Sequence, residues 1–502
     1  NWQEEYHIWD LAAGTGNLLA GLTNINNIWA STIDQADVDI MLARLRSGSG
    51  MFRNHIFKFD FLNDDFSKLP KGLKKVIDEN PEKLIIYINP PYAEAGNIKK
   101  LSGTGEHKDK VSLGNKTYEK YKDILGNASN EVFSQFFIRI YKEIPNCILA
   151  SFSKLKYINA TNFEKFRDVF KAKFLKGFIV PANTFDNVSG KFPIGFLIWD
   201  TSKKQKVKNI KVDIFDRIQG NEISKLSGKK NFYSGEKVRN INNWLKKFID
   251  NSDKKLGVLM ADAPDFQHNN HIAIINQPLK AHLIFQNITD NNLIPFCIYL
   301  SVRLCINGSW INDRDQFLYP TQKWETDREF QNDCLTFTLF HGQNRITAGQ
   351  HARRSEAGVN HWIPFSEAEV GAAESFDSHF MKEFIDGKIK PKETQGVKSV
   401  LLSENASFIP VKPLRFSKEA KDVFESGKKL WKYYHATGSY INTNASYYDI
   451  RKYFQGTDAN GRMNNKSIDE EYNKLIKDLR DKMDVLAKKI EPKIYEYGFL
   501  RE

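Results

Sequence analysis

The chain has few cysteines and no long apolar run. Only four cysteines occur among its 502 residues, and none forms a Cys-x-x-Cys pair. This argues against a disulfide scaffold or a cysteine zinc site and fits a reducing cytoplasm. A membrane-spanning helix needs about 20 consecutive apolar residues, but the best candidate, residues 293–306, is interrupted by Arg303. We therefore predict a cytoplasmic protein with no membrane span. The chain begins at Asn1 without a secretory signal, and we expect the natural chain to begin further upstream.

The charge balance and the composition narrow the class of protein. Hydrophobic residues make up 41% of the chain, which is typical of a globular protein. Lysine and arginine number 73 against 61 acidic residues, a net charge of +12. A basic protein of this kind favours a polyanionic partner, either nucleic acid or an anionic membrane surface. At about 150 residues per domain, the length predicts two to four domains.

The first 215 residues alternate between short apolar stretches and helical patterns. This alternation predicts an α/β fold with a doubly wound, Rossmann-like sheet covered by helices on both faces. In such sheets ligands bind at the carboxyl ends of the strands, and the motifs below all follow predicted strands. We expect strands at residues 7–11, 28–33, 56–59, 84–88, 147–152, 177–180 and 194–199.

The rest of the chain has a different pattern. Five lysines between residues 201 and 211 suggest the exit from the first domain. At the other end, Ser417 can cap a helix that ends near Gly438, and Ser467 with Glu470 forms a capping-box pattern before a long amphipathic helix. We therefore predict three domains: residues 1–215, a mixed region at 216–410, and a helical region at 411–502.

The first motif that carries chemistry follows the first predicted strand. Asp10 ends the strand, and Gly14 and Gly16 lie in the turn behind it. Glycines allow the backbone to approach a bound ligand closely. A dinucleotide site would carry a third glycine where this chain has Leu19, which disfavours that ligand. Asp10 can instead face a ligand ammonium group; the alternative is a tight turn without a ligand.

Two further carboxylates follow the second and third predicted strands. Asp34 can accept both hydroxyl groups of a ribose. Asp60 can accept from an adenine amine while Phe61 packs against the ring. Taken alone, Asp34 and Asp60 are better explained as surface acids, and Phe61 as a core residue. Together with Asp10 they describe a nucleoside with a charged tail, which fits S-adenosyl-L-methionine as the cofactor.

The fourth motif is Asn89-Pro90-Pro91-Tyr92, directly after the apolar stretch 84–88. Two prolines make a rigid, extended turn. The turn holds the Asn89 side-chain carbonyl and the Pro90 main-chain carbonyl as a pair of acceptors, and Tyr92 offers a flat face. Such a site suits a planar ring bearing an amino group; a purely structural turn is the alternative.

With these motifs, the first 200 or so residues resemble the S-adenosylmethionine-dependent amino methyltransferases of DNA, in particular the adenine-N6 enzymes. The motif order is similar to the gamma group, which implies target recognition in residues 216–410 and a modification role in a bacterial restriction system. Asn89 rather than serine favours adenine. The family's helix-borne segment before the glycine turn is absent, and Leu11 replaces a frequent proline. The resemblance implies Asn89, Pro90, Pro91 and Tyr92 as catalytic residues and Asp10, Ala12, Gly14, Gly16, Asp34, Asp60 and Phe61 as cofactor-binding residues.

Other positions are less specific. The resemblance implies a second aromatic residue opposite Tyr92 to stack on the target base, either Phe185 or Phe192. The expected partner is double-stranded DNA, and the candidate residues for contacting it are Lys99, Lys100, Arg353 and Arg354. A companion restriction or specificity subunit is a further expected partner.

The motif His268-Asn269-Asn270-His271 has no acidic partners at a suitable spacing in the sequence, so we predict no metal site there. Two other functions stay open. One is a methyltransferase acting on RNA or protein glutamine, and the other is a catalytically silent DNA-binding specificity subunit.

Overall fold

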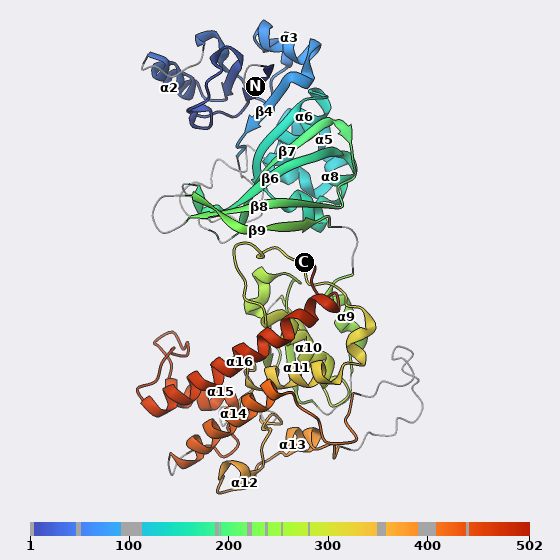
Figure 1. The fold of residues 1–502 in the computed structure, drawn as a ribbon, viewed down its shortest axis with the longest axis vertical. Coiled ribbons are helices and arrows are strands. Elements are labelled where there is room, and N and C mark those ends of the chain that lie inside the picture. Colours follow the sequence, from blue (N-terminus) through green and yellow to red (C-terminus); the bar gives the residue numbers. More distant parts are fainter. Residues whose placement is uncertain are drawn as a thin grey trace. The chain divides into compact units, whose positions relative to one another are not determined.

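The protein divides into two compact units (Figure 1). The first consists of residues 1–237 with 309–311, and the second of residues 238–308 with 312–502. The boundary lies beyond residue 215, because one strand of the first sheet, Asn209–Arg217, crosses that point and another, Ile223–Tyr233, follows it. The computed structural model describes residues 5–46, 52–91, 113–185, 190, 192–217, 223–235, 239–250, 252, 255–279, 282–348, 358–389, 408–437 and 441–502.

The first unit is built on a nine-stranded mixed sheet with the order β3-β2-β1-β4-β5-β7-β6-β8-β9. The first five strands in this order, β3, β2, β1, β4 and β5, are parallel to one another. Strand β7 runs antiparallel to both of its neighbours, and β9 is antiparallel to β8. The strands are β1 (His7–Asp10), β2 (Ile28–Thr32), β3 (Ile56–Lys58), β4 (Leu84–Ile88), β5 (Ile148–Lys154), β6 (Ala172–Pro181), β7 (Pro193–Lys204), β8 (Asn209–Arg217) and β9 (Ile223–Tyr233).

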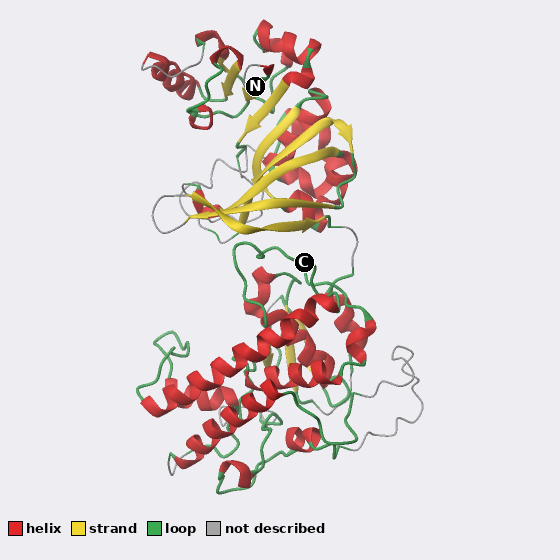
Figure 2. Ribbon diagram, in the orientation of Figure 1, coloured by secondary structure: helices red, strands yellow, loops and turns green. Residues whose placement is uncertain are grey.

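Helices cover both faces of this sheet, as the alternating pattern predicts. On one face, α2 (Gln35–Arg46) packs Val38 and Met41 against Ile8 and Ile28 of the strands. Figures 1 and 2 show helices along the other face, where the larger aromatic core lies. These are α3 (Lys71–Glu79), α5 (Lys116–Leu125), α6 (Val132–Glu143), α7 (Lys156–Asn159) and α8 (Glu164–Val169). The fold class is therefore α/β.

The lysine-rich segment 201–211 is not a domain exit. The last residues of β7 and the first residues of β8 occupy it, and β8 pairs with β9 at the edge of the sheet. All five lysines of this segment are exposed, and they lie at the end of β7, in the connection and at the start of β8. A charged connection within a sheet and a linker between domains therefore look alike in the sequence.

The second unit is mainly helical, with one small antiparallel sheet of β10 (Gly257–Ala261), β11 (Ala273–Ile275) and β12 (Ile284–Ile288). A single buried cluster runs from Ile241 to Leu500, so one core spans the predicted boundary at residue 410. The helices are α9 (Ile241–Leu245), α10 (Leu293–Leu304), α11 (Arg328–Phe340), α12 (Glu367–Val370), α13 (Phe380–Ile385), α14 (Lys418–Ala436), α15 (Tyr447–Gln455) and α16 (Glu470–Glu496).

The two long C-terminal helices test the capping predictions. Ser417 is the N-cap of α14 and its hydroxyl accepts from the backbone of Ala420, as predicted. For α16 the prediction is wrong by two residues, since Asp469 rather than Ser467 accepts from the first turn, at the backbone of Tyr472. None of the helices in the described ranges combines the length and apolarity that a bilayer span requires.

Candidate active site at the carboxyl edge of the first sheet

Strand register brings the ends of β1 and β4 together. The two strands are parallel neighbours, with Trp9 opposite Ile86, so Asp10 and Asn89 both lie where adjacent strands end. Strand β2 flanks β1 on the other side, with Ala30 opposite Asp10. Because β3 follows β2 in the sheet, the predicted motifs occupy four contiguous strand ends.

The turn after β1 needs its glycines. Gly14 and Gly16 have φ values of 51° and 82°, a region that other residues rarely adopt. A Cβ atom on Gly16 would also meet Met41 of α2 at 3.1 Å. The turn is held by the Ala13 N–H, which donates to Ser31 of β2 at 2.9 Å. Behind the turn lies one short 3-10 helix, Asn17–Leu19.

Asp10 is a buried carboxylate with little compensation. Only 1% of the residue is exposed. Its Oδ1 accepts from the backbone N–H of Ala12 at 3.1 Å, and no other hydrogen bond to Asp10 forms among the described residues. Burial raises the pKa of Asp10 to about 7, although the Ala12 hydrogen bond opposes this shift. A cationic group bound at this position would stabilise the ionised carboxylate.

Asp34 and Asp60 have local partners. The Oδ1 of Asp34 accepts from the Ala36 N–H at 2.9 Å at the start of α2, and the residue is exposed. Asp60 is half-buried and takes three hydrogen bonds from its own turn: from the N–H groups of Leu62 and Asn63 to Oδ1 at 3.0 and 3.2 Å, and from the Asn63 side chain to Oδ2 at 2.8 Å. Both side chains therefore also stabilise the backbone that follows their strands.

Phe61 does not face the edge of the sheet. It is 2% exposed, and its ring stacks on Phe136 of α6 at 5.3 Å and meets Trp9 edge-on at 5.9 Å. The prediction that it packs against a cofactor ring is therefore corrected, since the apolar core of the unit takes the side chain. The same Asp-Phe pair occurs whether the phenylalanine lies in the core or packs against a cofactor, so the sequence cannot distinguish the two positions of the ring.

The proline turn follows β4 directly. Asn89 is half-buried, Pro90 is buried and Pro91 is exposed. Because Ile88 lies opposite Ser151 of β5, the turn lies between the ends of β1 and β5. Tyr92 and the four DNA-contact candidates Lys99, Lys100, Arg353 and Arg354 lie outside the described residues.

The two candidate aromatic partners lie at the same edge. Strand β7 starts opposite the end of β5, with Ile194 opposite Lys154, and β6 ends opposite Pro193. Phe185 comes after β6 and Phe192 before β7, so both approach this edge. Both rings are half-buried against a small cluster, and Phe185 contacts Phe152 of β5 at 5.3 Å.

Sequence reasoning missed an ion cluster at the end of β5. Glu131, whose side chain is 2% exposed, lies 2.6 Å from the Lys156 ammonium and 3.4 Å from that of Lys154. The partners are about 25 residues apart in the sequence, so spacing gives no signal. The available signal was Lys154, two residues beyond the predicted strand 147–152.

Comparisons with known proteins give weak likenesses. No family model and no curated protein matches the chain. Similar solved structures include the methyltransferase subunit of a type I restriction-modification system from Streptococcus thermophilus (15% identity, 44% of this chain and 45% of that one, TM-score 0.30). Another is the type IIG restriction endonuclease BpuSI (19% identity, 42% of this chain and 24% of that one, TM-score 0.27). A third is the DNA-bound type ISP restriction-modification enzyme LlaBIII (12% identity, 52% of this chain and 23% of that one, TM-score 0.29). The chain thus spans 23% to 45% of their lengths, and TM-scores this low carry no argument about activity.

Proposed function

We propose that the protein is an S-adenosylmethionine-dependent methyltransferase that modifies the N6 amine of an adenine flipped out of double-stranded DNA. The observation that carries the proposal is the register of β1 and β4. It sets a buried carboxylate, Asp10, which takes one hydrogen bond from the described residues, beside a proline-fixed acceptor pair at Asn89 and Pro90.

The residues at the strand ends fit this cofactor. Asp10 offers a carboxylate to the ammonium of the methionine moiety, which would offset its cost of burial. Asp34 has its Oδ2 for the ribose, and Asp60 can accept one more hydrogen bond through Oδ2, while Gly14 and Gly16 leave the turn open to close approach. S-adenosylmethionine supplies a methyl group on a sulfonium centre, the electrophile that a weak amine nucleophile needs.

The proline turn would activate the target amine. An exocyclic adenine amine is a poor nucleophile, because its lone pair is delocalised into the ring. The Asn89 side-chain oxygen and the Pro90 carbonyl can each accept a hydrogen bond from one N–H of this amine. These two hydrogen bonds favour a tetrahedral geometry at the nitrogen. Two prolines hold these acceptors in place before the base arrives, so little reorganisation is needed.

The aromatic residues at the same edge would hold the base outside the duplex. Flipping costs a few kcal/mol of lost stacking. Tyr92 on one side and Phe185 or Phe192 on the other can return about 1–3 kcal/mol for each base stacked. The net charge of +12 favours a polyanion as the substrate.

The experiment is a side-by-side transfer assay. The full chain is incubated with methyl-labelled S-adenosylmethionine and either mixed-sequence duplex DNA, RNA or protein, and the modified product is hydrolysed and identified. We expect the label in DNA as N6-methyladenine. Label in cytosine, in RNA or in glutamine would contradict the substrate assignment, and no transfer to any of the three would contradict the activity.

A further inference from the structure

Two histidines that the proposed function does not use lie on one short turn of the second unit. His268 and His271 belong to the 3-10 helix η10 (Phe266–His271). A 3-10 helix has three residues per turn, so side chains three positions apart lie on the same face. The two ring centres are 6.2 Å apart and the ring planes meet at 53°.

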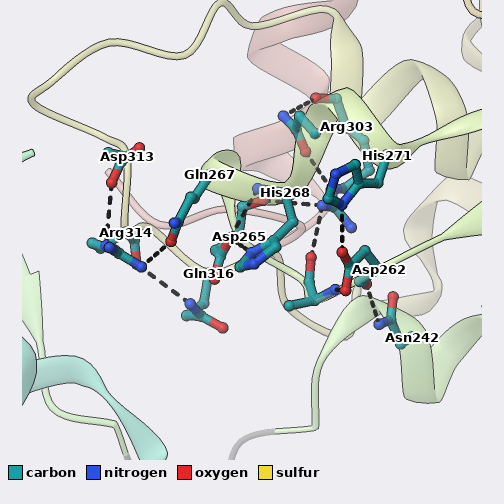
Figure 3. A network of polar contacts seen from close by, with 12 residues as sticks. Asn242, Asp262, Asp265, Gln267, His268, His271, Arg303, Asp313, Arg314 and Gln316 are labelled. Carbon is teal, nitrogen blue, oxygen red and sulfur yellow. Dashed lines mark hydrogen bonds and ion pairs between the residues drawn. The ribbon is translucent and has the colours of Figure 1, made fainter. Parts of the chain in front are cut away.

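Each imidazole has a carboxylate behind it (Figure 3). His268 Nδ1 lies 2.5 Å from Asp265 Oδ1, and His271 Nδ1 lies 2.6 Å from Asp262 Oδ2. A carboxylate at Nδ1 keeps the proton there and leaves the lone pair on Nε2. The two side chains are 30% and 51% exposed, and neither Nε2 has a hydrogen-bond partner among the described residues.

These acidic partners correct the sequence analysis. Asp265 lies three residues before His268, and Asp262 lies nine residues before His271. The prediction of no metal site rested on the absence of acidic partners at a suitable spacing. In the structure they orient the imidazoles instead, an arrangement that recurs behind metal-binding histidines.

A buried arginine fixes the segment that carries the histidines. Arg303 of α10 is fully buried. Its guanidinium donates to the carbonyl oxygens of Ala263 and Asp265 at 2.9 and 3.0 Å and to Asn269 Oδ1 at 2.8 Å. Since Asn269 also donates back to the Arg303 carbonyl, the backbone on both sides of His268 is held to one helix. The imidazoles are therefore carried on a rigid support.

The local charge favours a cation over a phosphate. Asp265 and Asp262 contact His268 and His271, and Asp313 interacts electrostatically with His268, while the half-buried Arg314 pairs with Asp313 at 3.2 Å. Carboxylates outnumber the exposed positive groups, so a DNA phosphate would be repelled unless both imidazoles were protonated. A divalent cation would be attracted.

We infer that His268 and His271 bind one divalent transition-metal ion of the zinc class through their Nε2 atoms. With a metal–nitrogen bond of about 2.1 Å, two rings on one ion have centres at most about 6.4 Å apart, and the observed 6.2 Å lies within that reach. A rotation that brings the exposed His271 ring about 1 Å closer would give a tetrahedral angle. Since no three His, Cys, Asp or Glu side chains converge in the described part of the chain, water would complete the coordination.

The test is zinc binding to the full chain without a polyhistidine tag, measured by isothermal titration calorimetry with ZnCl₂. We expect one site per chain, and a melting temperature that rises with zinc. His271→Ala and His268→Ala should each weaken binding at least about tenfold, and Asp262→Asn by about tenfold, as for other orienting carboxylates. Asp262→Asn thus separates a metal site with an oriented ligand from a bare surface histidine pair.

Matched controls make the result specific. His282→Ala removes another exposed histidine of the same unit, and Asp377→Asn removes another exposed carboxylate. Neither should change zinc affinity by more than about twofold. Circular dichroism verifies that each variant is folded. Absence of stoichiometric zinc binding, or binding that survives His268→Ala and His271→Ala in folded protein, would overturn the inference, whatever the outcome of the methyl-transfer assay.

Discussion

The aspartates at the ends of β1 and β3, Asp10 and Asp60, differ in how many hydrogen bonds the surrounding protein donates to them. Both strands end near an aspartate at the same edge of the sheet. Asp10 is buried and, among the described residues, takes one hydrogen bond, from the backbone of Ala12. Asp60 is half-buried and takes three hydrogen bonds from residues within its own turn. An aspartate at a strand end therefore keeps more capacity for a ligand where the following turn donates fewer hydrogen bonds to it.

Electrostatics follow the same division. Burial raises the pKa of Asp10 to about 7, so its ionised form is destabilised until a cation arrives. Asp34, like Asp60, serves its own backbone, since it accepts from the Ala36 N–H at the start of α2. We infer that most of the cofactor's charge recognition comes from Asp10 after β1, and that Asp34 after β2 and Asp60 after β3 contribute hydrogen bonds. The predictions below test this division.

The largest effect is expected at the proline turn. Asn89→Ala removes one of the two proposed acceptors for the amine, and loss of one preorganised polar group typically costs about 10²–10³ in rate. The affinity of Asn89→Ala for the cofactor should stay within about threefold of that of the parent chain, a change much smaller than the change in rate. Asn80→Ala, at an exposed asparagine of the same unit, is the control and should transfer methyl groups normally. Normal turnover by folded Asn89→Ala would remove the proposed mechanism.

The second effect is on cofactor binding. Asp10→Asn keeps the shape of the side chain and removes its charge. A hydrogen bond to a charged group contributes about 1.5–3 kcal/mol, so the cofactor dissociation constant should rise by about 10–100-fold. Calorimetric titration with S-adenosylmethionine measures it, with the exposed Asp39→Asn as control. Unchanged affinity would mean that β1 does not carry the charge recognition.

The third effect is on the pH dependence of stability. The pKa of Asp10 is about 7 in the folded protein against 3.8 as the ordinary value, so the folded state holds this proton more tightly. The free energy of unfolding should therefore fall as pH rises from about 4 to about 7, by at most about 1.4 kcal/mol per pH unit from this residue. Asp10→Asn removes that contribution.

Urea unfolding at about pH 5 and about pH 7 measures this difference. The variant should gain stability relative to the parent chain as pH rises, while the Asp39→Asn control should track the parent. A constant difference between parent and Asp10→Asn across that range would show that Asp10 is not the buried group with little compensation described above.

The smallest effect is expected at β2. Asp34→Ala removes the acceptor for the Ala36 N–H, and loss of such a cap costs about 1 kcal/mol of stability. Cofactor affinity should change less than in Asp10→Asn. Thermal unfolding and calorimetric titration of the same preparation separate the two effects. A loss of affinity as large as that of Asp10→Asn would place charge recognition on β2 as well.

The sequence predicts the first unit far better than the second. The stretch 84–88 coincides with β4, and 28–33 differs from β2 by one residue, because apolar strands bounded by turns give a strong local signal. Strands β8 and β9 were missed since their lysines resemble a linker. In the second unit, packing among distant helices decides the fold, and one core joins residues 241 and 500.

The candidate site is only partly predictable for the same reason. Four motifs at strand ends could be identified, and parallel pairing brings those ends to one edge. The partners of each side chain could not be identified, because they depend on tertiary contacts. Phe61 lies in the core through its contact with Phe136, and the Glu131 cluster joins two distant segments. The carboxylates behind His268 and His271 were likewise visible only once the 3-10 turn was in place.

The most direct test of the account is single-turnover methyl transfer to an adenine-containing DNA duplex, compared at low and saturating S-adenosylmethionine. If β1 holds the cofactor and the proline turn activates the amine, saturating cofactor should restore Asp10→Asn to within a few-fold of the parent rate. Asn89→Ala should stay about 10²–10³-fold slower at any cofactor concentration. Recovery of Asn89→Ala at saturating cofactor, or failure of folded Asp10→Asn to recover, would contradict the division of roles between the two strand ends.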